Sequence, residues 1–421
     1  MIIDDKLNKL LQASPQITEP YDVFMSYFDD YYKAISHRLS GNGVMKIEAI
    51  EASMCANESL KNNIAARLAI KLLKSSLYLK IHSHKTKIRI DVIYPVYKEI
   101  NRMSPRTQKN PWGEDALVKK IEIFKKIERD NPNICINLWI IDDACPDGSG
   151  DFAQLILQKN YPNDLGIKYQ VLYLRDAIEQ NLYPLKNSPK GSIKGAAVNL
   201  GMHKILKSYK SSNIGEDCFI LDNDADLSIH PGLVGLLLHE LYVQNAVAVI
   251  GSRRSEDAVA LIKPSRDHRG KLYIAIMQNL IPCLLEAQIF DTNRAFKFYT
   301  PEAARYISTN QTMFQFPYQI ESIILLVNRF PKKVIPHGIV YIDSYPLSTA
   351  TSKVSYYQHI LDQVALSDRF YGKDKCKKLK KLLLDIKQSG WREIESKIPA
   401  IIIDTPISKL HELDIYNILK K

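Results

Sequence analysis

The chain has 421 residues, which is enough for one large domain with additions or for two or three smaller units. It contains 57 lysines and arginines against 46 aspartates and glutamates, a formal net charge of +11. This excess favours an acidic partner, such as nucleotide phosphates, a lipid surface or nucleic acid, but does not separate the three. The first twenty residues lack the apolar centre of a signal peptide, and polar residues interrupt the most apolar stretch, 232–251. We therefore expect a cytoplasmic protein without a signal peptide or transmembrane segment, peripheral at a membrane at most.

Residues 1–84 form a first, N-terminal helical region. Apolar residues recur at three- and four-residue spacing from Tyr21 to Leu39 and from Ile47 to Leu79, with Gly41 and Gly43 between them. This region is also rich in aromatic residues, which motivates a hypothesis of membrane docking: Tyr21, Phe24, Tyr27, Phe28, Tyr31 and Tyr32.

Residues 85–350 change to short β-rich runs that alternate with helical segments. The predicted strands are Ile88 to Tyr97, Leu138 to Ala144, Tyr169 to Leu174, Cys218 to Leu221 and Val247 to Gly251. Such alternation favours an α/β fold with a doubly wound, mostly parallel sheet. Residues 351–421 are again helical and rich in lysine, especially at 373–381, which predicts a C-terminal helical region.

Polar residues follow several of these strands. Asp142 and Asp143 end one strand, and the turn after them leads into a helix. Because ligands of open α/β sheets bind beyond the carboxyl ends of the strands, these endings should converge on one crevice. A carboxylate there could accept a hydrogen bond from a nucleobase or a ribose hydroxyl, although a capped turn would use the same residues.

The apolar run Phe219 to Leu221 ends in three carboxylates, Asp222, Asp224 and Asp226. So much negative charge beyond a buried strand is unfavourable unless a cation compensates it, and hard divalent ions prefer oxygen ligands. Asp224 and Asp226, one residue apart, are therefore predicted to share a metal ion, Mn²⁺ or Mg²⁺. The alternative is a turn that caps the helix ahead of Pro231.

Three further segments supply cations or a base. The run Lys190 to Gly201, which includes Lys194, places glycines and lysines where a helix begins, so a diphosphate could approach them. Arg253 follows a strand and Lys297 follows a helix, and both could contact phosphate. The alternative for the Lys190 to Gly201 run is tight helix packing, and the alternative for Arg253 and Lys297 is a solvated charge cluster. Glu321 could act as a general base toward an acceptor hydroxyl, or could simply favour the start of a helix.

Taken in order, these motifs resemble the inverting family 2 glycosyltransferases, most closely the dolichyl-phosphate mannose and glucose synthases. The motifs that carry the resemblance are Val92 to Glu99, Ile140 to Ser149, Lys194 to Ala197, Asp224 to Ser228, Val249 to Arg253, Asp291 to Lys297 and Phe316 to Glu321. They cover roughly residues 88–345, and Lys353 weakly echoes a closing serine-lysine motif. The glycine expected before Phe296 is Ala295, and no membrane-spanning tail follows the core, so the acceptor is not identified.

The resemblance implies a GT-A fold that transfers a hexose from a nucleotide-sugar donor, with UDP or GDP as the nucleotide. It implies a nucleoside pocket lined by Pro95, Tyr97 and Glu99, with Asp142 or Asp143 at the base or ribose. It also implies a metal and diphosphate at Asp224 and Asp226, with Lys194 nearby, and Arg253 and Lys297 on the phosphate side.

The acceptor implied is a lipid phosphate, a glycan or a protein, and no nucleic acid partner is expected. Two other functions fit the same residues. A nucleotidyltransferase on a related sheet could use the same carboxylates and lysines, and a non-catalytic effector could use the sheet as a scaffold.

Overall fold

The computed structural model describes residues 3–24, 26–39, 43–182, 194–209, 216–315, 317–344 and 356–420. Lys190, Phe316 and Lys353, and the boundary expected at residue 350, lie outside these ranges. The boundary expected at residue 84 falls in the short connection between helix α5 (Ile64–Ser83) and strand β1 (Lys87–Val96).

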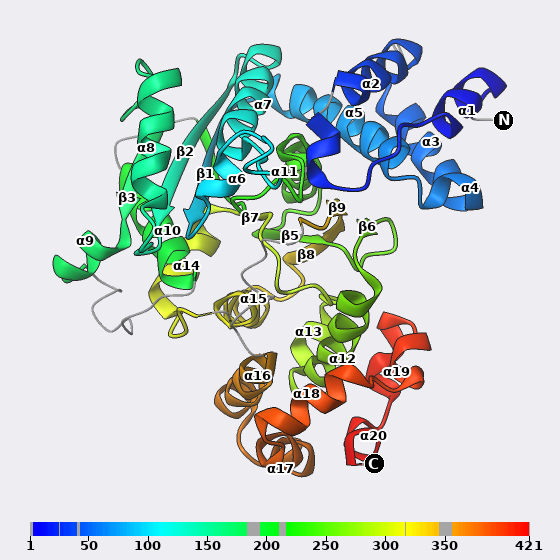
Figure 1. Ribbon diagram of the computed structural model, residues 1–421, viewed down its shortest axis with the longest axis vertical. Helices are drawn as coiled ribbons and strands as arrows, with labels where there is room; N and C mark the ends of the chain where they lie inside the picture. Colours follow the sequence, from blue (N-terminus) through cyan, green and yellow to red (C-terminus); the bar gives the residue numbers. More distant parts are fainter. Residues whose placement is uncertain are drawn as a thin grey trace.

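A seven-stranded sheet is the centre of the described molecule (Figure 1). Its strand order is β3-β2-β1-β4-β7-β5-β8, and every neighbouring pair is parallel except the two pairs that β7 makes with β4 and β5. The strands after β1 are β2 (Ile134–Asp142), β3 (Tyr169–Tyr173), β4 (Glu216–Asp222), β5 (Ala248–Ser252), β7 (Lys297–Tyr299) and β8 (Val334–Gly338). Strands β6 (Val259–Leu261) and β9 (Val340–Ile342) pair in a small second sheet. The predicted α/β class with a mostly parallel sheet is confirmed.

The sheet is buried on both faces, as the near-continuous apolar strands require. In β1, Val92 and Tyr94 belong to one core and Ile93 to the other, because side chains alternate along a strand. The first core is covered by α7 (Ala116–Asp130), α8 (Ser149–Asn160) and α11 (Val234–Val243). The opposite core is covered by α10 (Gly195–Ser208), α12 (Pro264–Leu280), α14 (Pro301–Asn310) and α15 (Tyr318–Arg329). Shorter helices connect these elements: α6 (Ile100–Met103), α9 (Leu174–Glu179), η4 (Pro231–Leu233) and α13 (Pro282–Glu286).

The N-terminal helices extend the first core. They are α1 (Asp5–Gln12), η1 (Pro20–Phe24), α2 (Ser26–Arg38), α3 (Val44–Ala56), α4 (Glu58–Lys61) and α5. The helix expected from Ile47 to Leu79 is broken because Asn57 and Asn63 each cap a new helix with their side chains. Phe28 and Tyr31 are buried in the shared core, so they offer no aromatic face to a membrane.

Buried charges join these helices to the loop between β5 and β6. Lys71 of α5 is 1% exposed, and its Nζ lies 2.8 Å from Oε1 of Glu51 and 2.8 Å from Oδ2 of Asp257. The neighbouring Arg67 donates to the carbonyl oxygen of Asp257 at 2.6 Å. The loop that follows Arg253 is therefore held by α5.

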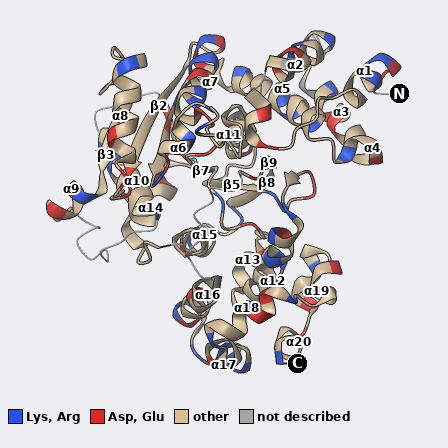
Figure 2. Cartoon of the chain, viewed as in Figure 1, with Lys and Arg blue, Asp and Glu red and all other residues tan. Residues whose placement is uncertain are grey.

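The C-terminal helices are α16 (Tyr356–Tyr371), α17 (Lys377–Asp385), α18 (Gln388–Ser396), α19 (Ala400–Asp404), η6 (Ile407–Glu412) and α20 (Ile415–Lys420). They belong to the second core, where α16, α19, η6 and α20 pack against α12 and α17 packs against α16 and α20. Basic and acidic residues are distributed over the outer helices (Figure 2). Within the described ranges, no helix combines the length and apolar character needed to cross a membrane.

Candidate functional site

The candidate site lies where the strand order reverses. Strand β1 has β2 on one side and β4 on the other, and the chain leaves all three strands at the same edge of the sheet. Open α/β sheets bind ligands at such a point, beyond the carboxyl ends of the strands. The polar segments after β1, β2 and β4 therefore start from the same edge of the sheet, as predicted.

Strand β4 ends in a buried carboxylate. Asp222 is 1% exposed, and its Oδ1 has no hydrogen-bond partner within the described part of the chain. Burial raises the pKa of Asp222, opposed by the charges of Lys194 and Lys297. Lys297 stands opposite Asp222 in the register of β7 with β4. Burying a carboxylate with an unpartnered oxygen is unfavourable in free energy, and the positive charges of the neighbouring lysines offset part of that penalty.

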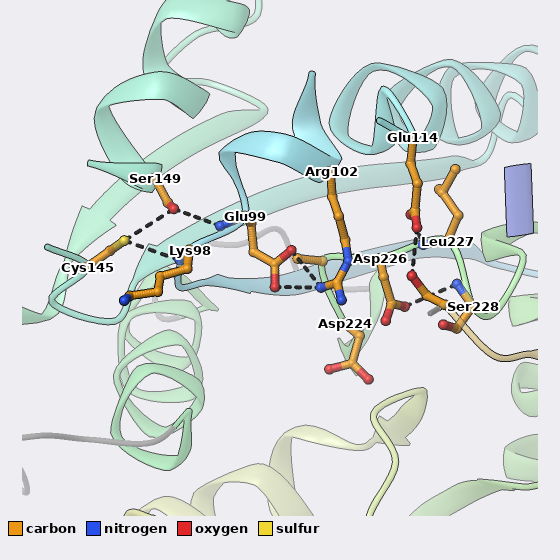
Figure 3. Close-up of polar contacts among 12 residues, drawn as sticks. Lys98, Glu99, Arg102, Glu114, Cys145, Ser149, Asp224, Asp226, Leu227 and Ser228 are labelled. Carbon is orange, nitrogen blue, oxygen red and sulfur yellow. Dashed lines mark hydrogen bonds and ion pairs between the residues drawn. The ribbon is translucent and has the colours of Figure 1, made fainter. Parts of the chain in front are cut away.

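Beyond Asp222 the chain turns, and the turn carries the two predicted metal ligands. Asp224 Oδ1 forms an ion pair with Nζ of Lys194, and Asp226 Oδ1 accepts a hydrogen bond from the Ser228 amide at 3.1 Å. Figure 3 shows both carboxylates projecting from the same side of the turn. The structure therefore brings Asp224, Asp226 and Lys194 together.

Asp224 is surrounded by cations from separate elements. Burial opposes its ionisation, but the charges of Lys194 and Arg294 outweigh this and hold the pKa of Asp224 well below its usual range. Lys120 lies under the turn, where its Nζ donates to Oδ1 of Asn223 at 2.9 Å and to the carbonyl oxygen of Asp224. Burial lowers the pKa of Lys120 to about 8.

Sequence reasoning missed Lys120, although a signal was present. Lys120 lies on the apolar stripe of α7 with Leu117, Ile121 and Phe124, at spacings of three and four residues. A lysine on the buried face of an amphipathic helix is rarely tolerated without partners. Its position in the stripe therefore indicated a buried polar contact.

A second group of charges lies beside Asp226 (Figure 3). Arg102 donates from Nη1 to both oxygens of Glu99, at 2.8 and 2.7 Å. Glu114 accepts from the Leu227 amide at 2.9 Å and from the Ser344 hydroxyl at 2.7 Å. Burial, and then the charge of Asp226, raises the pKa of Glu114 to about 7. Burial alone would lower the pKa of Arg102, but the charges of Glu99, Asp226 and Glu114 raise it, so these carboxylates all lie close to the Arg102 guanidinium.

The residues predicted for the nucleoside pocket have mixed environments. Tyr97 is 38% exposed at the end of β1, whereas Pro95 is buried within the strand and Glu99 is paired with Arg102. Asp142 accepts from the amides of Cys145 and Gly150, at 2.9 and 2.7 Å, and so caps the turn after β2. Asp142 therefore has the role of a turn cap, which was the alternative to a contact with a nucleobase or a ribose hydroxyl.

Asp143 has a different contact. Its Oδ2 accepts from the backbone amide of Lys194 at 2.7 Å, which ties the end of β2 to the start of α10. Lys194 has φ of +65°, a conformation that side-chain-bearing residues adopt rarely. The contact with Asp143 therefore helps to fix a strained residue that in turn pairs with Asp224.

The two basic residues predicted on the phosphate side are already partnered. Arg253 donates from Nε and Nη2 to Asp291, at 2.8 and 2.7 Å, and lies over the Tyr341 ring. Lys297 is 1% exposed and donates to Oε1 of Gln319 at 3.0 Å and to the carbonyl oxygen of Arg294. Burial lowers the pKa of Lys297 to about 8.

Glu321 does not have the environment of a base facing an acceptor. It is fully buried and accepts from the amides of Thr312 and Met313, at 3.0 and 2.7 Å. Arg369 of α16 also donates to it, as does the Thr312 hydroxyl at 2.8 Å. Both oxygens are engaged within the protein, so the expectation that Glu321 takes a proton from an acceptor hydroxyl is not supported.

The carboxylates after β4 suit a metal that arrives with a phosphorylated ligand. Within the described ranges, no cluster of three or more His, Cys, Asp or Glu side chains could hold a metal ion by itself. Mg²⁺ commonly binds through one or two carboxylates and completes its shell with substrate phosphates and water. Asp224 and Asp226 provide two such carboxylates on one turn.

A scan of family models finds no match to this chain, and a search of curated proteins also finds none that is significant.

Proposed function

We propose that this protein is a metal-dependent, inverting glycosyltransferase with a GT-A type fold, using a UDP- or GDP-linked sugar as donor. The observation that carries the proposal is the Asp224–Asp226 turn at the reversal of strand order, with the half-buried Lys194 and the buried Lys120 both contacting it. An acidic turn surrounded by cations suits a ligand that brings both a divalent ion and a diphosphate. The short motifs that resemble family 2 enzymes support the same function.

In this proposal, Asp224 and Asp226 would hold Mn²⁺ or Mg²⁺, which would neutralise part of the charge on the diphosphate. Lys194, which forms an ion pair with Asp224, and Arg294, whose charge lowers the pKa of Asp224 against the effect of burial, contribute fixed positive charge near the turn. Preorganised charge of this kind stabilises a departing diphosphate more than it stabilises the intact donor. Lys120 keeps the turn in place through its two contacts.

The environment of Glu321 favours an acceptor that needs no base. A phosphate acceptor is already ionised, so it can attack the anomeric carbon directly and invert it in a single displacement. A hydroxyl acceptor would have to lose a proton to some other group, because the oxygens of Glu321 are occupied. A lipid phosphate is therefore the acceptor class we favour over a glycan or a protein hydroxyl.

The test is a thermal-shift and hydrolysis screen of UDP- and GDP-sugars with Mn²⁺, Mg²⁺ or EDTA. The wild type is compared with Asp224→Asn/Asp226→Asn and with Asp30→Asn/Asp385→Asn, which makes the same charge change at two exposed positions. We expect metal-dependent stabilisation by one donor, lost only in the first variant. Release of pyrophosphate instead of a nucleoside diphosphate would identify a nucleotidyltransferase. Donor binding without turnover would favour a non-catalytic effector.

A further inference from the structure

Lys194 holds one of the two carboxylates that the proposed function assigns to a metal ion. Its Nζ forms an ion pair with Oδ1 of Asp224, whereas Oδ1 of Asp226 accepts a hydrogen bond from the Ser228 amide at 3.1 Å. Within the described ranges, no other lysine or arginine lies within ion-pair distance of either carboxylate. A metal ion that uses both aspartates therefore has to displace the Lys194 ammonium from Asp224 or share the carboxylate with it.

The backbone of Lys194 is fixed, so an exchange of partners involves its side chain. The Lys194 amide donates to Oδ2 of Asp143 at 2.7 Å, and its φ is +65°. Gly195 begins α10 so close to Phe314 that a Cβ on the glycine would lie 2.5 Å from the Phe314 carbonyl oxygen. The side chains of Lys194 and Asp224 are 19% and 28% exposed, so a ligand can reach the ion pair. A lysine ammonium on its flexible stem can turn to a new acceptor while the backbone stays in place.

The Lys194 ammonium lies among the negative charges at the end of β4. Burial opposes its charge, but Asp224, and then Asp222 and Asp226, raise the pKa of Lys194 above its usual value. A divalent ion held by Asp224 and Asp226 would lie beside this ammonium, and charges of the same sign repel at short distance. A diphosphate changes this balance, because its oxygens accept from an ammonium and also serve as ligands of the metal ion.

We propose that the Lys194 ammonium competes with the metal ion for Asp224, and that the diphosphate of the donor ends this competition by becoming the new partner of the ammonium. The donor thereby frees Asp224 for the metal ion, so the two ligands bind cooperatively. Such coupling is reciprocal, because each ligand raises the affinity for the other by the same factor. The inference rests on the proposed function and adds to it the positioning residue that couples the metal ion to the donor.

The experiment uses the full chain and two separate binding measurements. Electron paramagnetic resonance of free Mn²⁺ gives the affinity for the metal ion alone, and calorimetry gives the affinity for UDP or GDP at saturating Mn²⁺. The test variant is Lys194→Met, and Lys194→Arg restores the positive charge. The matched control is Lys207→Met, which makes the same charge change at an exposed position of α10. Thermal midpoints verify folding, and Lys194→Gln serves as the test variant if Lys194→Met does not fold.

We expect the two affinities of Lys194→Met to change in opposite directions. Mn²⁺ alone should bind at least about tenfold more tightly than to the wild type, and the nucleoside diphosphate should bind at least about tenfold more weakly. Lys194→Arg and Lys207→Met should resemble the wild type in both measurements. A residue that only supported the fold of the site would weaken both affinities when replaced. The gain in Mn²⁺ affinity should disappear when Asp224→Asn/Asp226→Asn is added to Lys194→Met.

Four results would overturn the inference, and only the last of them also overturns the proposed function. The first is equal or weaker binding of Mn²⁺ alone by Lys194→Met, while the wild type binds Mn²⁺ and the nucleotide together. The second is an unchanged affinity for the nucleoside diphosphate, and the third is a gain in Mn²⁺ affinity that survives the Asp224 and Asp226 substitutions. The last is that neither the wild type nor any variant binds Mn²⁺ or a nucleoside diphosphate, alone or together.

Discussion

Replacing Lys71 with methionine tests how firmly the N-terminal helices are joined to the rest of the protein. Lys71 is 1% exposed and lies 2.8 Å from both Glu51 and Asp257, and its Nζ also donates to the Gly338 carbonyl oxygen at 3.2 Å. Methionine retains most of the side-chain volume but removes the charge. The change therefore isolates the electrostatic contact from the packing.

The magnitude follows from what the substitution leaves behind. Removing one partner of a buried ion pair generally costs about 3–5 kcal/mol, because the other charge stays buried and uncompensated. Two features place Lys71→Met at the lower end of that range. Glu51 keeps a contact with Lys74 at 2.8 Å, and the side chain of Asp257 is 41% exposed. We expect a loss of about 3 kcal/mol in the free energy of unfolding.

The assay is urea unfolding followed by tryptophan fluorescence, with limited proteolysis to locate any local opening. The control is Lys33→Met, because Lys33 and Asp30 are 75% and 79% exposed and lie 3.7 Å apart. An exposed pair of this kind contributes about 0–1 kcal/mol. We expect Lys71→Met to expose cleavage sites near Asp257. If both variants have the same stability and cleavage pattern, the buried network does not join the two parts as described.

Three further predictions concern single contacts. Lys120→Met should weaken binding of the nucleoside diphosphate, measured by calorimetry, at least about tenfold because the turn loses both of its contacts to the ammonium; unchanged affinity would exclude this positioning role. His82 and His239 form a 3.1 Å contact, and burial lowers both pKa values, that of His82 to about 4. The unfolded chain binds more protons than the folded chain below the unfolded pKa of about 6.5, so the free energy of unfolding should be fully present above that pH and should fall as the pH drops toward 4. In urea titrations, His82→Gln should reduce the slope of this free energy against pH. An equal slope in both proteins would argue against a contribution from His82. Glu321→Gln should lower the free energy of unfolding by about 1–3 kcal/mol, since the bond to Arg369 loses its charge, while donor hydrolysis by the folded protein is retained; a stable but inactive variant would restore the base hypothesis.

The sequence predicted the strands of the first half of the sheet well. Strand β1 was expected from Ile88 to Tyr97 and spans Lys87–Val96, because its apolar run is long and bounded by polar residues. The short strand β7 was missed, since Lys297–Tyr299 gives too few residues for an alternating pattern. Its antiparallel pairing with β4 depends on contacts between distant segments, which no local pattern reports.

The candidate site was predictable only where its residues stand in local sequence motifs. Asp224, Asp226 and Lys194 each stand in a local motif, and the structure brings them together. The partners of Arg253 and Glu321 could not be predicted, because Asp291, in the segment between α13 and β7, and Arg369, on α16, are distant from them in the sequence. Charged residues near a site therefore cannot be divided into ligand-binding and structural groups from their spacing alone.

The central claim is most directly tested by following the donor that stabilises the protein with proton NMR during metal-dependent turnover. An inverting transferase should convert an α-linked donor to a β-configured product, or to the β-anomer of the free sugar when water is the acceptor, and should release a nucleoside diphosphate. Asp224→Asn/Asp226→Asn should abolish the reaction. Retention of the α configuration would contradict the single displacement, and release of pyrophosphate or no reaction with any UDP- or GDP-sugar would contradict the glycosyltransferase assignment.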